Sequence, residues 1–185
     1  IEDSPEIFAN DIQYKAENEN NQSIVDVLTQ NSARVIEWLA DVHGLDFSVV
    51  NDFDYPGHSK RRMHGLPTRA GAELIDALRT ACESVGIDII CDRRARLLFF
   101  DEYLITGVGV TGPEGRMETI ECQKLILACN GFGGNRTLVS ELMPEIKEAL
   151  WFGHAGNQGD AIGWAAGLDA RLENLGAYQG LSLIH

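Results

Sequence analysis

The sequence has few of the features that would associate the chain with a membrane or with nucleic acid. No apolar run approaches the ~18 residues that a membrane-spanning helix needs. Residues 1–22 are mostly acidic and polar, so we expect no signal peptide. The formal net charge of −13 argues against a surface for nucleic acid or anionic lipid, because the phosphates of either would repel it. A protein without nucleic-acid partners and without a membrane span is the expectation.

The cysteines also lack the spacing of a metal site or of a disulfide framework. Cys82, Cys91, Cys122 and Cys129 include no Cys-x-x-Cys pair. Three of them lie in apolar patterns, where cysteine behaves as a small hydrophobic residue. We therefore expect no metal site. The pattern fits a reducing compartment, and the cytoplasm is the expected location.

Length and composition are those of a single globular domain of mixed helices and strands. The chain has 185 residues, of which 44% are hydrophobic and 23% are charged. Helical spacing predicts one helix that begins at a Ser23 cap and ends at Gly44, and a second that begins at a Thr68 cap and ends at Gly86. The intervening residues, 46–66, are rich in Gly, Pro, Asp and Asn and are expected to form a loop.

The second half of the sequence predicts strands and then two short helices. Strands are expected at 87–91, 96–100, 104–111 and 117–121, with the last three as an antiparallel meander. The apolar run 124–129 predicts a central strand buried on both faces. Helices are expected at 135–142 and 159–167; in the latter, glycines recur at i, i+4 spacing and indicate a tightly packed face.

The most informative segment is the glycine-rich turn that follows the apolar run. Gly131, Gly133 and Gly134 come directly before a helical pattern, so the turn has little side-chain bulk and many backbone N–H groups. Such a turn suits close approach to a phosphate, a ribose or a flat ring. A plain structural connection remains the alternative, because the spacing is not Gly-x-Gly-x-x-Gly.

Several segments resemble the flavoprotein family of fumarate reductase and succinate dehydrogenase. Residues 127–135 (Leu-Ala-Cys-Asn-Gly-Phe-Gly-Gly-Asn) resemble its second flavin-contact segment, and residues 156–163 resemble its Gly-Asp-Gly segment. Residues 57–65 and 69–75 resemble the stretch that leads into the flavin domain, and residues 177–180 the segment that closes it. The Arg-Met-His-Gly and Tyr-Gln-Gly segments look more like the 3-ketosteroid-dehydrogenase-like branch.

The resemblance implies an α/β fold, a partial Rossmann-like FAD-binding domain with a small antiparallel β-meander. It also implies FAD as the cofactor of the parent protein, which would transfer a hydride between flavin and a C–C bond of a small-molecule substrate, as a dehydrogenase or a reductase. The strand, Gly-x-Gly-x-x-Gly turn and helix that hold the pyrophosphate in such domains do not occur in the sequence. Residues 1–185 are thus expected to be an internal part of an FAD-binding oxidoreductase domain, without its first βαβ element and without a capping domain. Weak FAD binding and self-association through an exposed sheet edge are expected.

The resemblance also assigns cofactor contacts to particular residues. The backbone of Ala95 would meet the adenine edge, and Asp160 the ribityl or pyrophosphate end; alternatively, Ala95 is an ordinary strand residue and Asp160 only complements a helix dipole. Asn130 stands where the family often has glycine, and asparagine tolerates the left-handed backbone. The complete set of expected cofactor contacts is Ala95, Ala128, Cys129, Asn130, Gly131, Asn157, Gly159 and Asp160.

A basic cluster in the first half has two interpretations. Arg62 and His64, beside Arg61, are candidates for the edge of the flavin or substrate pocket, where positive charge would stabilise a reduced flavin. Alternatively, the cluster is a solvated loop whose charges pair with Asp52, Asp54 or Glu73. For the whole chain, the alternative function is a non-catalytic α/β binding or scaffold module that no longer holds flavin.

Overall fold

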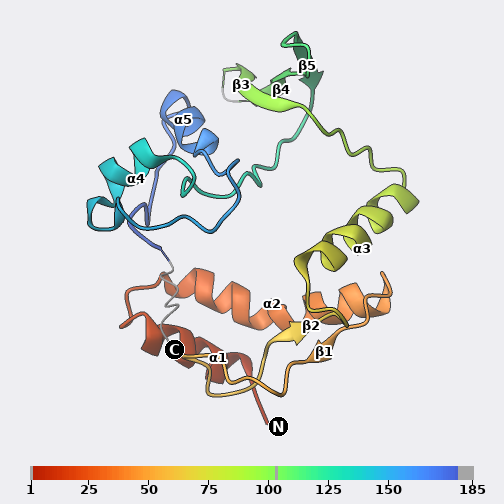
Figure 1. Ribbon diagram of the computed structural model, residues 1–185, viewed down its shortest axis with the longest axis vertical. Helices are drawn as coiled ribbons and strands as arrows, with labels where there is room; N and C mark the ends of the chain where they lie inside the picture. Colours follow the sequence, from red (N-terminus) through yellow and green to blue (C-terminus); the bar gives the residue numbers. More distant parts are fainter. Residues whose placement is uncertain (1, 103, 179–185) are drawn as a thin grey trace. The chain divides into compact units, whose positions relative to one another are not determined.

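The computed structural model describes residues 2–102 and 104–178, which form two compact units, 1–89 and 90–185 (Figure 1). The first unit contains α1 (Pro5–Lys15), α2 (Gln22–Asp41) and α3 (Gly71–Ser84). Two short antiparallel strands, β1 (Ser48–Val49) and β2 (His64–Gly65), pair within the loop region that joins α2 to α3. Helix α1 packs on α2, whose buried side chains are Val25 and Thr29.

Both helices predicted for this unit are confirmed, although their caps differ from the predicted ones. The side chain of Asn21, not Ser23, accepts the first backbone N–H groups of α2. Thr68 lies two residues before the N-cap position of α3, where its hydroxyl donates to the carboxylate of Glu73 and accepts from the backbone N–H of Ala70. Gly86, at φ +76°, follows the last turn of α3 as predicted.

The second unit contains an antiparallel meander followed by short helices. Strands β3 (Arg94–Asp101), β4 (Leu104–Thr111) and β5 (Met117–Glu121) pair in the order β3-β4-β5, so the predicted meander is confirmed. Helix α4 (Arg136–Leu142) follows, then a single 3-10 turn, η1 (Pro144–Ile146), and helix α5 (Asp160–Gly167). The helix-and-strand composition agrees with the predicted α/β class.

The predicted central strand at 124–129 is wrong, as is the predicted strand at 87–91. Both segments are extended but unpaired, and the side chain of Ile126 is 89% exposed. A strand buried on both faces needs hydrogen-bonding neighbours at both edges. Within the described ranges, strands pair only as β1 with β2 and in the meander, so neither apolar run has a neighbour.

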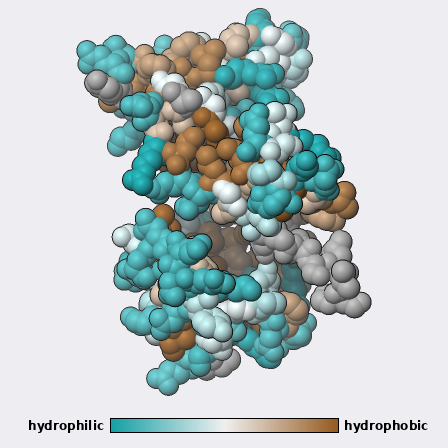
Figure 2. Space-filling view, turned by 90° about the vertical axis from the view of Figure 1, so that its left-hand side faces the viewer, coloured by the Kyte–Doolittle hydropathy of each residue, from teal (hydrophilic) through white to brown (hydrophobic). Residues whose placement is uncertain are grey.

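Several apolar side chains of the second unit are exposed, one of them in the unpaired run 124–129. Ile126, Leu150 and Phe152 are exposed by 89%, 79% and 66%. Hydrophobic surface is visible in the upper half of Figure 2. Contiguous apolar surface of this kind marks a region that another polypeptide can cover.

The helix at the end of the described chain is less tightly packed than its glycines predicted. No atom lies within 4 Å of a Cβ built on Gly163 or on Gly167. Of these three glycines, only Gly159, immediately before α5, is closely packed, whereas Gly163 and Gly167 are exposed. None of the helices in residues 2–102 and 104–178 combines the length and the apolar character that a membrane crossing requires.

Candidate functional site

Hydrogen bonds join two segments that the sequence singled out, residues 131–135 and residues 154–160. We call these two segments the paired loops. The backbone N–H of Gly134 donates to the carbonyl of Asn157 over 2.9 Å. In return, the Gln158 amide nitrogen donates to the carbonyl of Gly134 over 3.1 Å. The side chain of Asn135 donates to the carbonyl of Gln158 over 3.0 Å and caps α4 through Leu138 N–H. One asparagine therefore fixes both a helix and the contact between the loops.

Gly159 lies where the paired loops meet α5, and only glycine suits its position. Its φ of +79° is in the left-handed region, and it is buried. A Cβ there would lie 2.7 Å from Cδ1 of Leu138 and 2.9 Å from Cβ of Phe132. The segment of residues 156–160 can therefore approach α4 as closely as it does only without a side chain at this position.

Asn130 adopts a left-handed backbone, which asparagine tolerates. Its φ is +60°, and its side-chain oxygen accepts the backbone N–H of Gly131 over 2.9 Å. A Cβ on Gly131 would meet no atom within 4 Å. Ala128, Cys129 and Asn130 are also exposed, so the backbone before the paired loops is accessible to a flat ring or a sugar.

A cleft of about 640 Å³ borders the paired loops within the second unit. It is lined by residues before and in β3, at the end of β4, and from the second of the paired loops, including Arg93, Arg94, Thr111, Gly156, Gln158 and Asp160. Arg94 lies 3.6 Å from the carboxylate of Asp160, and the Trp164 indole N–H donates to the carbonyl of Arg96 over 3.3 Å. These contacts place Ala95, between the two arginines, beside the start of α5.

The structure thus brings together one part of the predicted site. Ala95, Asn157, Gly159 and Asp160 lie around the cleft and the paired loops, which begin at Gly131. Arg62 and His64 belong to the other unit. That these two residues share a face with Asn130 and Asp160 stays a prediction.

Arg62 is the centre of an ionic network in the first unit. Its guanidinium donates to both carboxylate oxygens of Asp3, over 2.7 and 2.8 Å, and to Asp11 over 2.6 Å. It also lies over the Phe8 ring, 4.6 Å from the centroid, and its side chain is only 10% exposed. His64 contacts the same residue, with Nδ1 2.8 Å from the carbonyl oxygen of Arg62. The network holds α1 against the loop before β2.

The network shifts the pKa values of its acids. The hydrogen bond from Arg62 lowers the pKa of Asp3 below its usual value, and the pairing with Asp3 raises the pKa of Arg62. Burial works against the charged form of Asp11, but the hydrogen bonds from Arg62 and Ser59 outweigh it, so the pKa of Asp11 is also lowered. All three groups are therefore charged at neutral pH.

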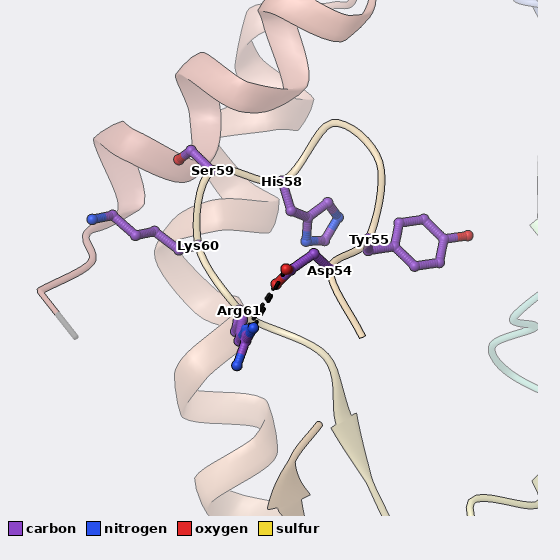
Figure 3. Close-up of a pocket in the computed structure, with 6 residues that line it drawn as sticks. All are labelled: Asp54, Tyr55, His58, Ser59, Lys60 and Arg61. Atoms are coloured by element: carbon purple, nitrogen blue, oxygen red, sulfur yellow. Dashed lines mark hydrogen bonds and ion pairs between the residues drawn. The ribbon is translucent and has the colours of Figure 1, made fainter. Parts of the chain in front are cut away.

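Arg61 pairs with an acid of its own loop, as the solvated-loop interpretation predicted. Its Nε donates to Asp54 over 2.7 Å, and this bond lowers the pKa of Asp54. Figure 3 shows these two side chains pointing toward one another, whereas Lys60 and Tyr55 point to opposite sides of the loop. The pocket of about 470 Å³ in this view is lined by Asp54, Tyr55, His58, Ser59, Lys60 and Arg61. Asp52 pairs with Arg69 instead.

Arg62→Ala should lower the free energy of unfolding by about 2 kcal/mol, because it removes buried charge-assisted hydrogen bonds and a cation–π contact. Arg61→Ala is the matched control and should change stability little, since its pair is exposed. Urea denaturation measures both. A small effect of Arg62→Ala, equal to that of the control, would contradict the role of the network.

The free energy of unfolding of the native chain and that of Arg62→Ala should depend differently on pH. Because the pKa values of Asp3 and Asp11 are lowered in the folded state, their stabilisation is fully present above the ordinary aspartate pKa of about 4. It is lost as the pH falls through the lowered values. The stability difference between the native chain and Arg62→Ala should therefore shrink below about pH 4.

Sequence reasoning missed two residues of the site, Arg94 and Gln158. Gln158 lies inside the segment of residues 156–163, but nothing in that pattern showed that its amide would join the loops. Arg94 directly precedes Ala95, and its neighbour Asp160 is 66 residues away in the sequence, so no local signal connected them. In the part of the chain that the structure describes, no group of three or more His, Cys, Asp or Glu side chains could hold a metal ion.

Comparisons with known proteins identify the family of the chain. A family model described as FAD binding domain matches residues 1–181. A probable fumarate reductase, Ifc3, from Shewanella frigidimarina is 25% identical over 95% of this chain and 30% of its own length. The NADH:fumarate oxidoreductase of Klebsiella pneumoniae is 26% identical over 96% of this chain and 18% of its own length. The chain thus spans less than a third of the length of these relatives.

Solved structures give the same result at the level of the fold. The open conformation of a flavocytochrome c3 fumarate reductase matches 90% of this chain and 30% of that chain, with a TM-score of 0.81 and 25% identity. The 3-ketosteroid-Δ4-(5α)-dehydrogenase of Rhodococcus jostii RHA1 matches 95% of this chain and 43% of that chain, with a TM-score of 0.78 and 17% identity. The predicted fold class, part of an FAD-binding α/β domain, is confirmed.

Proposed function

Since the chain belongs to the family of FAD binding domains, as its resemblance predicted, we propose that it is part of a flavoprotein oxidoreductase. FAD is the cofactor of this family. The parent protein would transfer a hydride between FAD and a C–C bond of a small-molecule substrate. The fumarate reductases among its relatives, at 25% and 26% identity, support a dehydrogenase or reductase of this kind. The predicted cytoplasmic location stays a prediction.

The observation that carries the proposal is the pair of joined loops. Gly131 leaves its backbone open, Gly159 has no room for a side chain, and the residues on either side of Gly159 line the cleft. This arrangement fits a large flat dinucleotide better than a compact metal or a peptide. The residues that would hold FAD are those expected from the sequence: Ala95, Ala128, Cys129, Asn130, Gly131, Asn157, Gly159 and Asp160.

Bound FAD supplies hydride transfer, and the residues of this chain supply binding and orientation. Asp160 is the first residue of α5 and lies 3.6 Å from Arg94, and its carboxylate would accept hydrogen bonds from ribityl hydroxyl groups. The open backbone at Gly131 would face the adenosine half. Asn157 holds Gly134 through its carbonyl and so keeps both loops in place for the ligand.

We also propose that residues 1–185 are an internal part of the FAD-binding domain. The chain covers 30% and 18% of the lengths of two relatives, which supports this. Residues 2–102 and 104–178 include no strand and helix joined by a Gly-x-Gly-x-x-Gly turn. The exposed apolar side chains of the second unit support the predicted self-association of the isolated chain.

Asp160→Asn in the full-length parent protein tests the cofactor site. We expect roughly tenfold weaker FAD retention, because a charged acceptor contributes about 1.5–3 kcal/mol to a hydrogen bond. The ratio of flavin to protein absorbance after dialysis measures it. Asp169→Asn, an exposed aspartate just after α5, is the control and should retain FAD. Full retention by Asp160→Asn would refute the assignment, and a colourless native protein would favour the non-catalytic module.

A further inference from the structure

The cleft beside the paired loops contains an arginine that the expected cofactor contacts leave without a role. The Arg94 side chain is 52% exposed, and its nearest carboxylate, on Asp160, lies 3.6 Å away. Charge-assisted hydrogen bonds between such groups are ordinarily about 2.7–2.9 Å long. The guanidinium is therefore only loosely held and can exchange Asp160 for another anion.

Its neighbour Arg93 differs in this respect, although it also lines the cleft. The Arg93 Nε donates to the Glu118 carboxylate over 2.9 Å, and the two side chains are 28% and 35% exposed. This pair ties the residue before β3 to β5. Arg93 is thus a structural cation already neutralised by its partner, whereas Arg94 faces the cleft with donors to spare.

Resting on the proposed function, we propose that Arg94 binds the diphosphate of the ADP half of the cofactor in this cleft. A diphosphate needs several N–H donors or a positive charge, and the guanidinium offers five donors in a planar fork that matches phosphate oxygens. The residue next to it, Ala95, is the position expected to meet the adenine edge. Adenine and diphosphate would then be recognised by consecutive residues of β3.

The charges around the cleft set the energetics of this exchange. Two acids, Asp92 and Asp160, line it together with the two arginines, and Glu118 neutralises Arg93. A diphosphate must therefore displace Asp160 from Arg94. That displacement frees the Asp160 carboxylate to accept hydrogen bonds from hydroxyl groups. Binding of the diphosphate to Arg94 would therefore also make Asp160 available to the cofactor.

Titration of the 185-residue chain with ADP tests the proposal, with two-dimensional NMR of the backbone amides as the readout. We expect native binding in the submillimolar to millimolar range, weakened by added NaCl. Arg94→Gln should weaken it at least fivefold, and the matched Arg93→Gln less than twofold. The affinities of the two variants for adenosine, which lacks phosphate, should differ much less than their affinities for ADP. Unchanged spectra outside the cleft show that each variant is folded.

Asp160→Asn separates this proposal from the proposed function. Because ADP has no ribityl chain, the variant should bind ADP about threefold more tightly, as it loses the carboxylate that competes for Arg94. The same substitution weakens FAD retention in the full-length protein. Two results would overturn the role of Arg94, and only that role: equal ADP affinity of Arg94→Gln and the native chain, or no binding by the native chain at about 10 mM ADP. The Asp160→Asn flavin measurement in the parent protein is independent of that result.

Discussion

Gly159→Ala should lower the free energy of unfolding of the second unit by about 2–5 kcal/mol. The left-handed backbone at φ +79° costs a residue with a Cβ roughly 1–2 kcal/mol. The new methyl group would also lie 2.7 Å from Leu138 and 2.9 Å from Phe132, and such overpacking typically costs about 1–3 kcal/mol. The Leu138 side chain could rotate away at some loss of packing, but Cβ of Phe132 can move only with the backbone of the turn before α4.

Gly163→Ala, four residues further along the chain and inside α5, is the matched control. No atom lies within 4 Å of its Cβ, and it lies within α5, where alanine is favoured over glycine by about 1 kcal/mol. The control should therefore be neutral or slightly stabilising. Urea denaturation followed by tryptophan fluorescence would measure both variants. Similar destabilisation by the two substitutions would show that close packing at Gly159 is not what holds the loops.

The elements predicted correctly are those with local sequence signals. The helical spacing and the glycines that follow α2 and α3 act within a few residues, although the predicted caps Ser23 and Thr68 were not the observed ones. The turn at Gly112 lies between two β-rich runs. The left-handed backbone at Asn130 was likewise predictable, because asparagine adopts it at little cost. Each of these signals determines the conformation of residues close to it in the sequence and needs no distant partner.

The features that were missed depend on residues far apart in the sequence. The apolar run 124–129 predicted a buried strand, but burial requires neighbouring strands, and the described residues provide none. Arg62 pairs with Asp3 and Asp11, which lie 59 and 51 residues away. No periodicity relates such residues, so the sequence indicated the nearby acid Asp54 that pairs with Arg61 but not the two distant acids that pair with Arg62.

The isolated chain should be colourless after purification and should bind FAD more weakly than 1 μM, on the order of ten micromolar or above. Its described residues offer the paired loops, the backbone near Gly131 and the carboxylate of Asp160. Each hydrogen bond from these groups contributes only about 0.5–1.5 kcal/mol net. Immobilising a large flexible dinucleotide costs roughly 4–15 kcal/mol, which a few such bonds do not offset.

The pyrophosphate accounts for most of the expected deficit. In dinucleotide-binding domains it lies on the N–H groups of a Gly-x-Gly-x-x-Gly turn and a helix N-terminus, and the described residues contain no such element. Arg94 would supply one cation but no preorganised cradle of N–H groups. Quenching of flavin fluorescence during titration with the chain measures the affinity. Stoichiometric binding below 1 μM would contradict this account, because the pyrophosphate would then be held without a Gly-x-Gly-x-x-Gly turn.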